Sequence, residues 1–295
     1  MQQLDIFADS EPIQRANDLI AALVNLDQAA AQQAIRGLAA ADPHHEGLHK
    51  FHMLCNFLDH WTERFNESDG EEISATLVAE EQWIREQIVP AASVMGSAGD
   101  VLLRKVWGVM AKLSENTGID PKHPDCFAAE LYLRAYQFNN AVRTAKALPG
   151  ADMRAALQRW LALGYAGSGE MEQARRAALR FAWLSPQEFD RFVDEMHDKE
   201  LARDWNKFQA DLEDLDATWF PAWCANEKKA DTPVLDNLPA NDGGSAYRLV
   251  VSLGLRERAG IGRAVFEERA RLKQLNETFF AYYMRRRDNP AARMK

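Results

Sequence analysis

Long apolar runs are missing from this sequence. No stretch approaches the roughly 20 consecutive apolar residues that a helix needs to span a bilayer. The first residues, Met1-Gln2-Gln3-Leu4-Asp5, also lack the positive charges and the apolar core of a secretory signal peptide. Both absences predict a cytoplasmic protein that has no membrane partner.

Cysteine is scarce as well. The three cysteines, Cys55, Cys126 and Cys224, are far apart in the sequence, and none belongs to a Cys-x-x-Cys pair. This usage predicts reduced, buried thiols and argues against a disulfide framework or a zinc module.

Recognisable catalytic motifs are absent. The sequence has no Gly-x-Ser-x-Gly elbow, no phosphate-binding glycine loop and no His-Glu-x-x-His. Adjacent acidic residues, such as Glu80 and Glu81, point in different directions on a helix and are expected on a solvated face. We therefore predict a protein that is not an enzyme and needs no cofactor. The alternative is a helical enzyme, or a protein that binds a small ligand, whose site is assembled from dispersed polar residues.

Strand patterns are almost absent, whereas helix-forming residues dominate. Alternating β-branched runs are missing, and apolar residues recur at helical spacing along most of the chain. We therefore predict an all-α fold. Five segments are expected in order: a flexible N-terminal peptide (1–9), a helical-repeat domain (10–225), a loop (226–245), a C-terminal helical hairpin (246–287, with helices at 246–255 and 261–287) and a tail (288–295).

A repeated spacing of small and large apolar residues runs through the middle of the chain. Its members are Leu161, Ala162, Tyr165, Gly169, Ala174 and Pro186 and, 33 residues before two of them, Tyr132 and Ala141. A small residue at a helix crossing lets two helices approach, and a large one fills the groove of a neighbour. The pattern resembles the tetratricopeptide consensus over residues 122–187, and more weakly over a first hairpin at 10–43. The resemblance implies a tetratricopeptide-like α-solenoid of stacked antiparallel helical hairpins.

The match to this consensus is partial. The Trp expected early in the first helix is absent, Ala178 stands where an aromatic residue is usual, and Phe181 stands where a small residue is usual. The remaining hairpins are therefore expected to be degenerate repeats or plain helical pairs.

Histidines gather at the start of a predicted helix over 45–65. His45, His49 and His52 have i, i+4, i+7 spacing, which places them on one helical stripe. Three imidazoles on one stripe are candidate metal ligands, but no supporting carboxylate is identifiable. A polar helix face that picks up metal adventitiously is the favoured interpretation, and a metal-responsive protein is the alternative.

Two aromatic runs and one charge bias stand apart from the repeats. Trp219-Phe220-Pro221-Ala222-Trp223 is expected either to line a peptide groove or to seal the end of the helical stack. The whole chain has a net charge of −9. From Arg256 onwards, however, the sequence contains eleven Lys or Arg and only five Asp or Glu. Contact with nucleic acid is therefore expected only through this basic C-terminal helix, where aromatic residues precede Arg285-Arg286-Arg287. An acidic partner and a plain solvated face are the alternatives.

The N-terminal peptide is the most specific pattern. Gln3-Leu4-Asp5-Ile6-Phe7 resembles the bacterial sliding-clamp-binding motif, with Ile6 in place of the more usual Leu. The resemblance implies that Gln3, Leu4, Ile6 and Phe7 are partner-binding residues that enter the clamp in an extended conformation. The alternative is a tail that folds back, with Ile6 or Phe7 stapled onto the first helix.

These patterns together predict a non-enzymatic adaptor that binds protein partners through its helical repeats. The narrower hypothesis is that the N-terminal peptide tethers this adaptor to the DNA replication sliding clamp.

Overall fold

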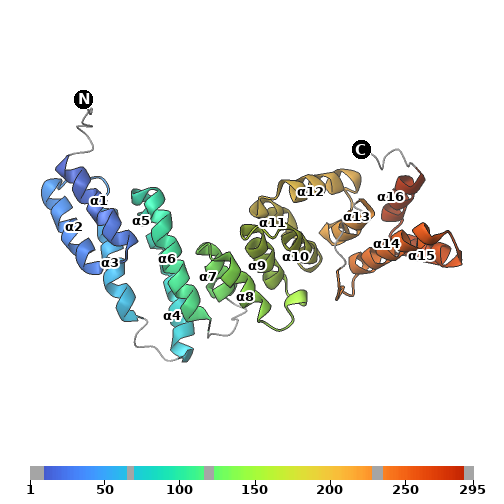
Figure 1. The fold of residues 1–295 in the computed structure, drawn as a ribbon, viewed down its shortest axis with the longest axis horizontal. Coiled ribbons are helices and arrows are strands. Elements are labelled where there is room, and N and C mark those ends of the chain that lie inside the picture. The colour runs from blue at the N-terminus through green and yellow to red at the C-terminus, as the bar shows by residue number, and fades with distance from the viewer. Residues whose placement is uncertain (1–9, 65–69, 116–122, 228–234, 289–295) are drawn as a thin grey trace. The chain divides into compact units, whose positions relative to one another are not determined.

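All regular structure in the described part of the chain is helical (Figure 1). The computed structural model describes residues 10–64, 70–115, 123–227 and 235–288, and no strand occurs among them. The all-α prediction is therefore confirmed. The α-helices are α1 (Glu11–Val24), α2 (Gln28–Ala41), α3 (Leu48–Arg64), α4 (Gly70–Trp83), α5 (Val89–Ala92), α6 (Ser97–Ser114), α7 (Ala128–Arg134), α8 (Phe138–Lys146), α9 (Ala155–Gly167), α10 (Met171–Leu184), α11 (Phe189–Met196), α12 (Lys199–Asp211), α13 (Phe220–Glu227), α14 (Asp242–Ala259), α15 (Arg263–Leu275) and α16 (Glu277–Asp288).

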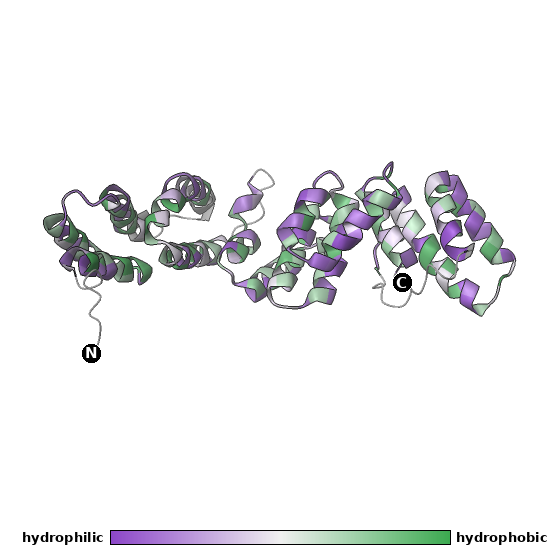
Figure 2. Ribbon diagram, turned by 90° about the horizontal axis from the view of Figure 1, so that it is seen from above, coloured by the Kyte–Doolittle hydropathy of each residue, from purple (hydrophilic) through white to green (hydrophobic). Residues whose placement is uncertain are grey.

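Short helical turns of other types connect some of these helices. They are the π-turn η1 (Ile84–Ile88) and the 3₁₀ turns η2 (Ser93–Met95), η3 (Pro124–Cys126), η4 (Ala151–Met153) and η5 (Ala217–Trp219). Among the described residues, no helix combines the length and apolar character that crossing a lipid bilayer requires. Figure 2 shows hydrophilic and hydrophobic residues alternating along the same helices, as burial of one side requires.

The chain forms two compact units, unit 1 (Met1–Thr144) and unit 2 (Ala145–Lys295). The division falls inside the segment predicted as one helical-repeat domain, residues 10–225. It also separates the two hairpins that carry the clearest repeat spacing, since α7 belongs to unit 1 and α9 to unit 2.

Three helical hairpins share one turn geometry. In each, a residue in the left-handed conformation follows the first helix, and the next N–H donates to the carbonyl oxygen five residues back at 2.8–3.0 Å. This is the Schellman arrangement, which satisfies carbonyl groups at a helix end. The left-handed residues are Leu26, Tyr136 and Gly169, the acceptors are Ala22, Tyr132 and Tyr165, and the buried small residues nine positions after the acceptors are Ala31, Ala141 and Ala174.

The repeated Ala spacing of the sequence therefore corresponds to a repeated local geometry. Glycine adopts the left-handed conformation without strain, whereas Leu26 and Tyr136 adopt it at a cost in conformational energy. The stacking of these hairpins into a solenoid stays a hypothesis.

Unit 1 is built on the α1–α2 hairpin, which packs against α3 and α6. Asp27 caps α2, its carboxylate accepting the Ala30 N–H at 3.0 Å. The helices α3, α5, α6 and α7 extend the same core. Its fully buried apolar side chains include Leu19, Leu23, Ile35, Leu38, Phe51, Leu54, Phe57, Val106 and Met110.

A helical irregularity and a glycine shape the next part of unit 1. Pro90 follows the π-turn η1, and a proline inside a helix removes one N–H and displaces the preceding carbonyl. The chain then reverses into α6, where a Cβ on Gly99 would lie 2.2 Å from the Ala92 carbonyl oxygen. Only glycine permits this close approach of α6 to α5.

Unit 2 has an aromatic core. The rings of Phe189, Trp205, Phe208, Phe220 and Trp223 contact one another with centroid distances of 4.9–6.1 Å. Trp219, at the start of the same run, packs on Phe279 of α16 at 5.2 Å. These side chains are buried, so the run at 219–223 forms core and does not line an open groove.

The C-terminal helices differ from the expected hairpin. The segment 261–287, predicted as one helix, is divided into α15 and α16 at Asn276, whose backbone is extended. The Asn276 side chain accepts the Phe279 N–H at 2.8 Å and so caps α16. Helix α14 begins at Asp242 and packs on α13 and on η5, where a Cβ on Gly243 would meet the Thr218 carbonyl oxygen at 2.1 Å. The expected two-helix hairpin at 246–287 is therefore wrong: the segment contains three helices.

Candidate functional site

The four residues of the predicted clamp-binding peptide, Gln3, Leu4, Ile6 and Phe7, lie outside the described residues. The first helix begins at Glu11, after Ser10 in an extended conformation and with Pro12 in its first turn.

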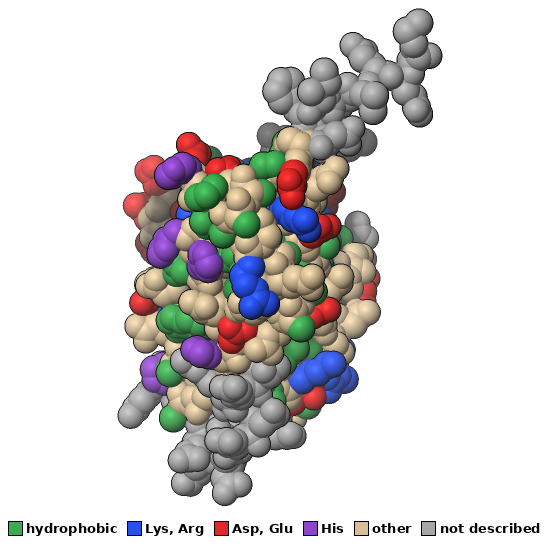
Figure 3. Space-filling view, turned by 90° about the vertical axis from the view of Figure 1, so that its left-hand side faces the viewer, with side chains coloured by type: hydrophobic (Ala, Val, Ile, Leu, Met, Phe, Trp, Pro, Cys, Tyr) green, Lys and Arg blue, Asp and Glu red, His purple; other side chains and the backbone are tan. Residues whose placement is uncertain are grey.

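The predicted histidine stripe does not form on one helix. Helix α3 begins only at Leu48, so His45 lies in the preceding turn, where its Nδ1 accepts the Gly47 N–H at 3.1 Å. His49 and His52 lie on α3 and are exposed. Figure 3 views unit 1 from the side that is on the left in Figure 1, and histidine side chains are spread along one edge of this view. In the part of the chain that is described, no three His, Cys, Asp or Glu side chains are placed to hold a metal ion.

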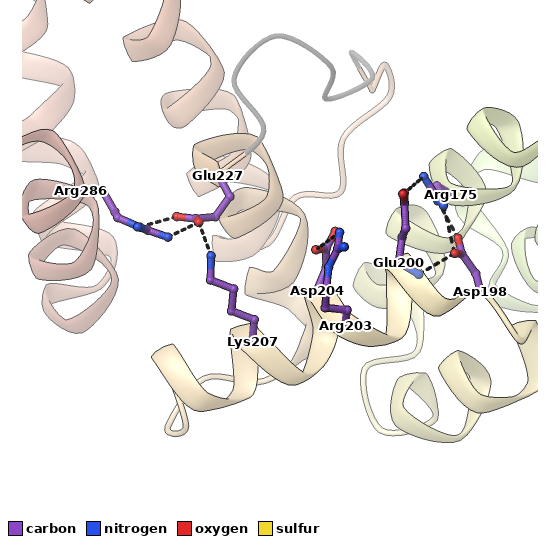
Figure 4. Close-up of polar contacts among 8 residues, drawn as sticks. All are labelled: Arg175, Asp198, Glu200, Arg203, Asp204, Lys207, Glu227 and Arg286. Atoms are coloured by element: carbon purple, nitrogen blue, oxygen red, sulfur yellow. Dashed lines mark hydrogen bonds and ion pairs between the residues drawn. The ribbon is translucent and has the colours of Figure 1, made fainter. Parts of the chain in front are cut away.

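A partly buried carboxylate, Glu227, joins three helices of unit 2. It lies at the end of α13 and accepts hydrogen bonds from Lys207 of α12 at 2.8 Å and from the Arg286 Nε at 2.7 Å (Figure 4). It also accepts one from Tyr282 of α16 at 2.8 Å. The Tyr282 hydroxyl also lies 2.9 Å from the Asp211 carboxylate, so its single proton serves one acid or the other. Burial by itself raises the pKa of Glu227, but the hydrogen bonds from Lys207, Tyr282 and Arg286 outweigh it and lower the pKa.

Glu257 of α14 is the centre of a second, partly buried network. It accepts hydrogen bonds from Tyr283 of α16 at 2.5 Å and from Arg269 of α15 at 2.8 Å, and it pairs with Arg287 at 3.0 Å. Burial again raises the pKa of Glu257, and the bonds from Tyr283 and the two arginines reverse the shift and lower it.

The adjacent pairs Tyr282-Tyr283 and Arg286-Arg287 thus divide between two carboxylates. Consecutive residues on a helix point about 100° apart, which sends one member of each pair to Glu227 and the other to Glu257. The aromatic and basic run that suggested nucleic-acid contact is therefore largely engaged inside unit 2. Of the three arginines, only Arg285 is exposed.

Two further buried networks also serve structure. In unit 1, Glu81 accepts a hydrogen bond from Arg134 of α7 at 2.6 Å, and Glu80 is buried beside it, so the expectation of a solvated acidic pair is wrong. In unit 2, Asp198 caps α12 by accepting the Glu200 N–H at 2.9 Å and pairs with Arg175 of α10 at 2.6 Å (Figure 4). Burial raises the pKa of Asp198, but the hydrogen bonds from Arg175 and from the Glu200 N–H outweigh this effect and lower the pKa.

The stability of unit 2 is expected to fall at both ends of the pH scale. Because Glu227 and Glu257 have lowered pKa values, their stabilisation is present above about pH 4.5 and is lost as the pH falls through the folded pKa. Burial and the neighbouring glutamates raise the pKa values of Tyr282 and Tyr283 above their usual 10, so stability falls again above that pH. Urea midpoints measured from pH 3 to pH 11 test this. Equal midpoints at pH 3 and pH 6 would contradict it.

An exposed apolar surface lies where α14 turns into α15. Leu255, Ile261 and Phe266 are 64%, 65% and 61% exposed, more than any other large hydrophobic residue in the described chain. Leu255 precedes the turn and Phe266 follows it, each by about one helical turn, so both lie at the same end of this antiparallel pair. Sequence analysis missed these residues, although Ile261 between Gly260 and Gly262 is an apolar side chain in a turn.

Comparisons with protein-family models, with curated proteins and with solved structures gave no match to this sequence. Proposals about function therefore depend on the chain's own residues and their geometry.

Proposed function

We propose that this protein is a non-enzymatic adaptor of the cytoplasm, tethered to the DNA replication sliding clamp by Gln3-Leu4-Asp5-Ile6-Phe7. The pentapeptide is the observation that carries the proposal, because its Gln, aliphatic and Phe residues have the spacing of the clamp-binding motif. Three residues, Ala8, Asp9 and Ser10, separate the pentapeptide from Glu11, the first residue of α1.

Two features of the described residues support a binding role over catalysis. The carboxylates of Asp198, Glu227 and Glu257 are each paired with arginine or lysine, and their pKa values are lowered. A carboxylate held in its charged form by such partners is poorly suited to exchange protons as a general acid or base at neutral pH. The three hairpins with one turn geometry support the further proposal of a tetratricopeptide-like α-solenoid, an architecture that commonly presents binding surfaces.

The clamp tether predicts a micromolar interaction that depends on two apolar side chains. Titration of purified bacterial sliding clamp with the full chain, followed by surface plasmon resonance, should give a dissociation constant on the order of 1–100 μM. Replacing Leu4 and Phe7 together with alanine removes about 3–5 kcal/mol of apolar burial and should weaken binding by more than 100-fold.

A matched pair of glutamines provides the control. Gln3→Ala should weaken clamp binding about tenfold because it removes the motif's hydrogen bonds, whereas Gln2→Ala, one position outside the motif, should leave it unchanged. No binding of the wild-type chain at 200 μM clamp, or equal binding by the Leu4/Phe7 double variant, would refute the tether.

A further inference from the structure

The turn between α14 and α15 carries three exposed apolar side chains. We call residues 255–266 the hairpin tip. Its Leu255, Ile261 and Phe266 are each more than 60% exposed, whereas Leu272, further along α15, is fully buried. The helical pair is therefore held by a buried face to which the three tip side chains do not belong. Large apolar groups left uncovered together mark a surface that binds another molecule.

Two exposed arginines accompany these side chains. Arg258 follows Leu255 by three residues on α14, and Arg263 precedes Phe266 by three residues on α15. Residues three apart are neighbours on a helix surface. Arginine can lay its aliphatic stem along an apolar neighbour and extend its charged head beyond it. The tip therefore places a long cationic side chain next to each of two apolar ones.

The net charge around the hairpin tip is positive. From Leu255 to Lys273 the sequence has six Lys or Arg against three Glu, a net charge of +3. Each of the three glutamates already pairs with an arginine at 2.8–3.1 Å, and the pairs are Glu257–Arg269, Glu267–Arg263 and Glu268–Arg256. Because each acid is matched by one arginine, the remaining positive charge is not compensated within this segment and favours an anionic occupant.

The size and charge of the hairpin tip fit a lipid surface better than a protein. A stable protein–protein interface takes about 800 Å² and 20 or more residues from each side, far more than three side chains at a turn provide. A second copy of the tip would bring its own positive charge against the first. An anionic bilayer, by contrast, accepts Phe and Leu side chains between its headgroups, attracts Lys and Arg to its phosphates and needs no matching pocket.

We propose that the hairpin tip binds the surface of an anionic lipid bilayer. Leu255, Ile261 and Phe266 enter the headgroup region, and Arg258 and Arg263 lie beside lipid phosphates. Such contact needs no spanning segment, so it replaces the sequence-based expectation that the chain has no membrane partner. It goes beyond the clamp tether and does not depend on it.

Flotation of the full-length chain with vesicles is the direct test. At about 1 mM accessible lipid, vesicles of equal parts phosphatidylcholine and phosphatidylglycerol should carry roughly half of the protein or more. Vesicles of phosphatidylcholine alone should bind at least about fivefold less, because the attraction to anionic headgroups is missing. Raising the salt concentration from about 0.1 M to about 0.5 M should also weaken binding several-fold, because that attraction is screened.

Variants of the hairpin tip separate insertion from plain charge attraction. Leu255→Ser with Phe266→Ser removes two inserted side chains and should weaken vesicle binding at least about tenfold. Arg258→Glu with Arg263→Glu reverses two charges and should weaken binding by a similar factor. All four residues are exposed, so the thermal midpoint of each double variant should stay within about 2 °C of the wild-type value.

Two exposed residues elsewhere in unit 2 supply matched controls. Met153→Ser and Arg203→Glu make the same kinds of change on η4 and α12, and they should alter vesicle binding less than about twofold. A further measurement reports insertion directly. The indole introduced by Ile261→Trp should be quenched by lipids brominated in their acyl chains, beyond any quenching of the wild-type chain.

Three results would each overturn the proposal. The first is no flotation with the anionic vesicles at several millimolar lipid, and the second is equal flotation by the tip variants and the controls. The third is unchanged binding by the apolar double variant together with loss in the arginine double variant, which would make the tip a basic surface for an acidic protein. The tip variants retain Gln3–Phe7 and should bind sliding clamp as the wild-type chain does, so failure of either proposal leaves the other standing.

Discussion

Replacing Phe220 with alanine is expected to lower the free energy of unfolding of unit 2 by about 3–5 kcal/mol. The Phe220 side chain is 0% exposed, and its ring lies 5.5 Å from Phe189, 5.3 Å from Trp205, 5.6 Å from Phe208 and 5.9 Å from Trp223. Alanine removes the ring that all four neighbours contact, and the cavity cannot close without moving α11, α12 and α13 together. Both the lost burial and the residual cavity contribute to the cost.

Phe266 supplies the matched control for this substitution. The same change, Phe266→Ala, removes a ring that is 61% exposed and should alter the free energy of unfolding by less than about 0.5 kcal/mol. Urea unfolding of the full chain, followed by tryptophan fluorescence and by hydrogen exchange in α12 and α13, measures both. A loss below about 1 kcal/mol for Phe220→Ala would mean that the aromatic core is not packed as described.

Replacing Glu227 with glutamine is expected to cost about 2–4 kcal/mol of the free energy of unfolding. The substitution keeps the shape of the side chain but leaves Lys207 and Arg286 without their shared counter-charge. Removing one partner of a buried pair typically costs 3–5 kcal/mol, and the lower end applies here because Lys207 is half exposed and can turn to water. The lost stability should appear at pH 7 and shrink as the pH falls through the lowered pKa of the wild-type carboxylate.

An exposed glutamate of the same helical region is the control. Glu277→Gln at the start of α16 removes the partner of Lys273 from a pair in which the Glu277 side chain is 83% exposed. Such a pair contributes less than about 0.5 kcal/mol, so this variant should have nearly the same urea midpoint as the wild type. If the two variants lose equal stability, the network around Glu227 does not hold α12, α13 and α16 together.

Local features of the fold could be predicted from the sequence, because they depend on neighbouring residues. Helices α9 and α10 lie within residues 122–187, where the repeated spacing predicts antiparallel helical hairpins. The spacing of Tyr165, Gly169 and Ala174 defines that hairpin, since each of these residues acts within its own turn. The break at Asn276 was missed because apolar spacing continues across it, although an Asn followed by an acidic residue is a helix-start pattern.

The polar networks could not be predicted, because their partners are distant in the sequence. Glu227 and Arg286 are 59 residues apart, and Glu81 and Arg134 are 53 apart. Nothing in a single sequence pairs such residues, so Glu80 and Glu81 resembled a solvated face and Arg286 resembled a free basic residue. For the candidate site, Gln3–Phe7 is a prediction from sequence alone, and the exposure of Leu255, Ile261 and Phe266 emerged only from the structure.

The Cys55 thiol, buried between α2 and α3, has a consequence for kinetics. It lies 3.8 Å from the Ala31 carbonyl oxygen, and burial and the nearby Asp59 raise its pKa to about 11. The thiolate, which is the reactive form, is therefore scarce at neutral pH and shielded from reagents. An alkylating reagent can reach this sulfur only when α3 separates from α2. The rate of Cys55 modification in the native protein therefore measures how often α2 and α3 separate.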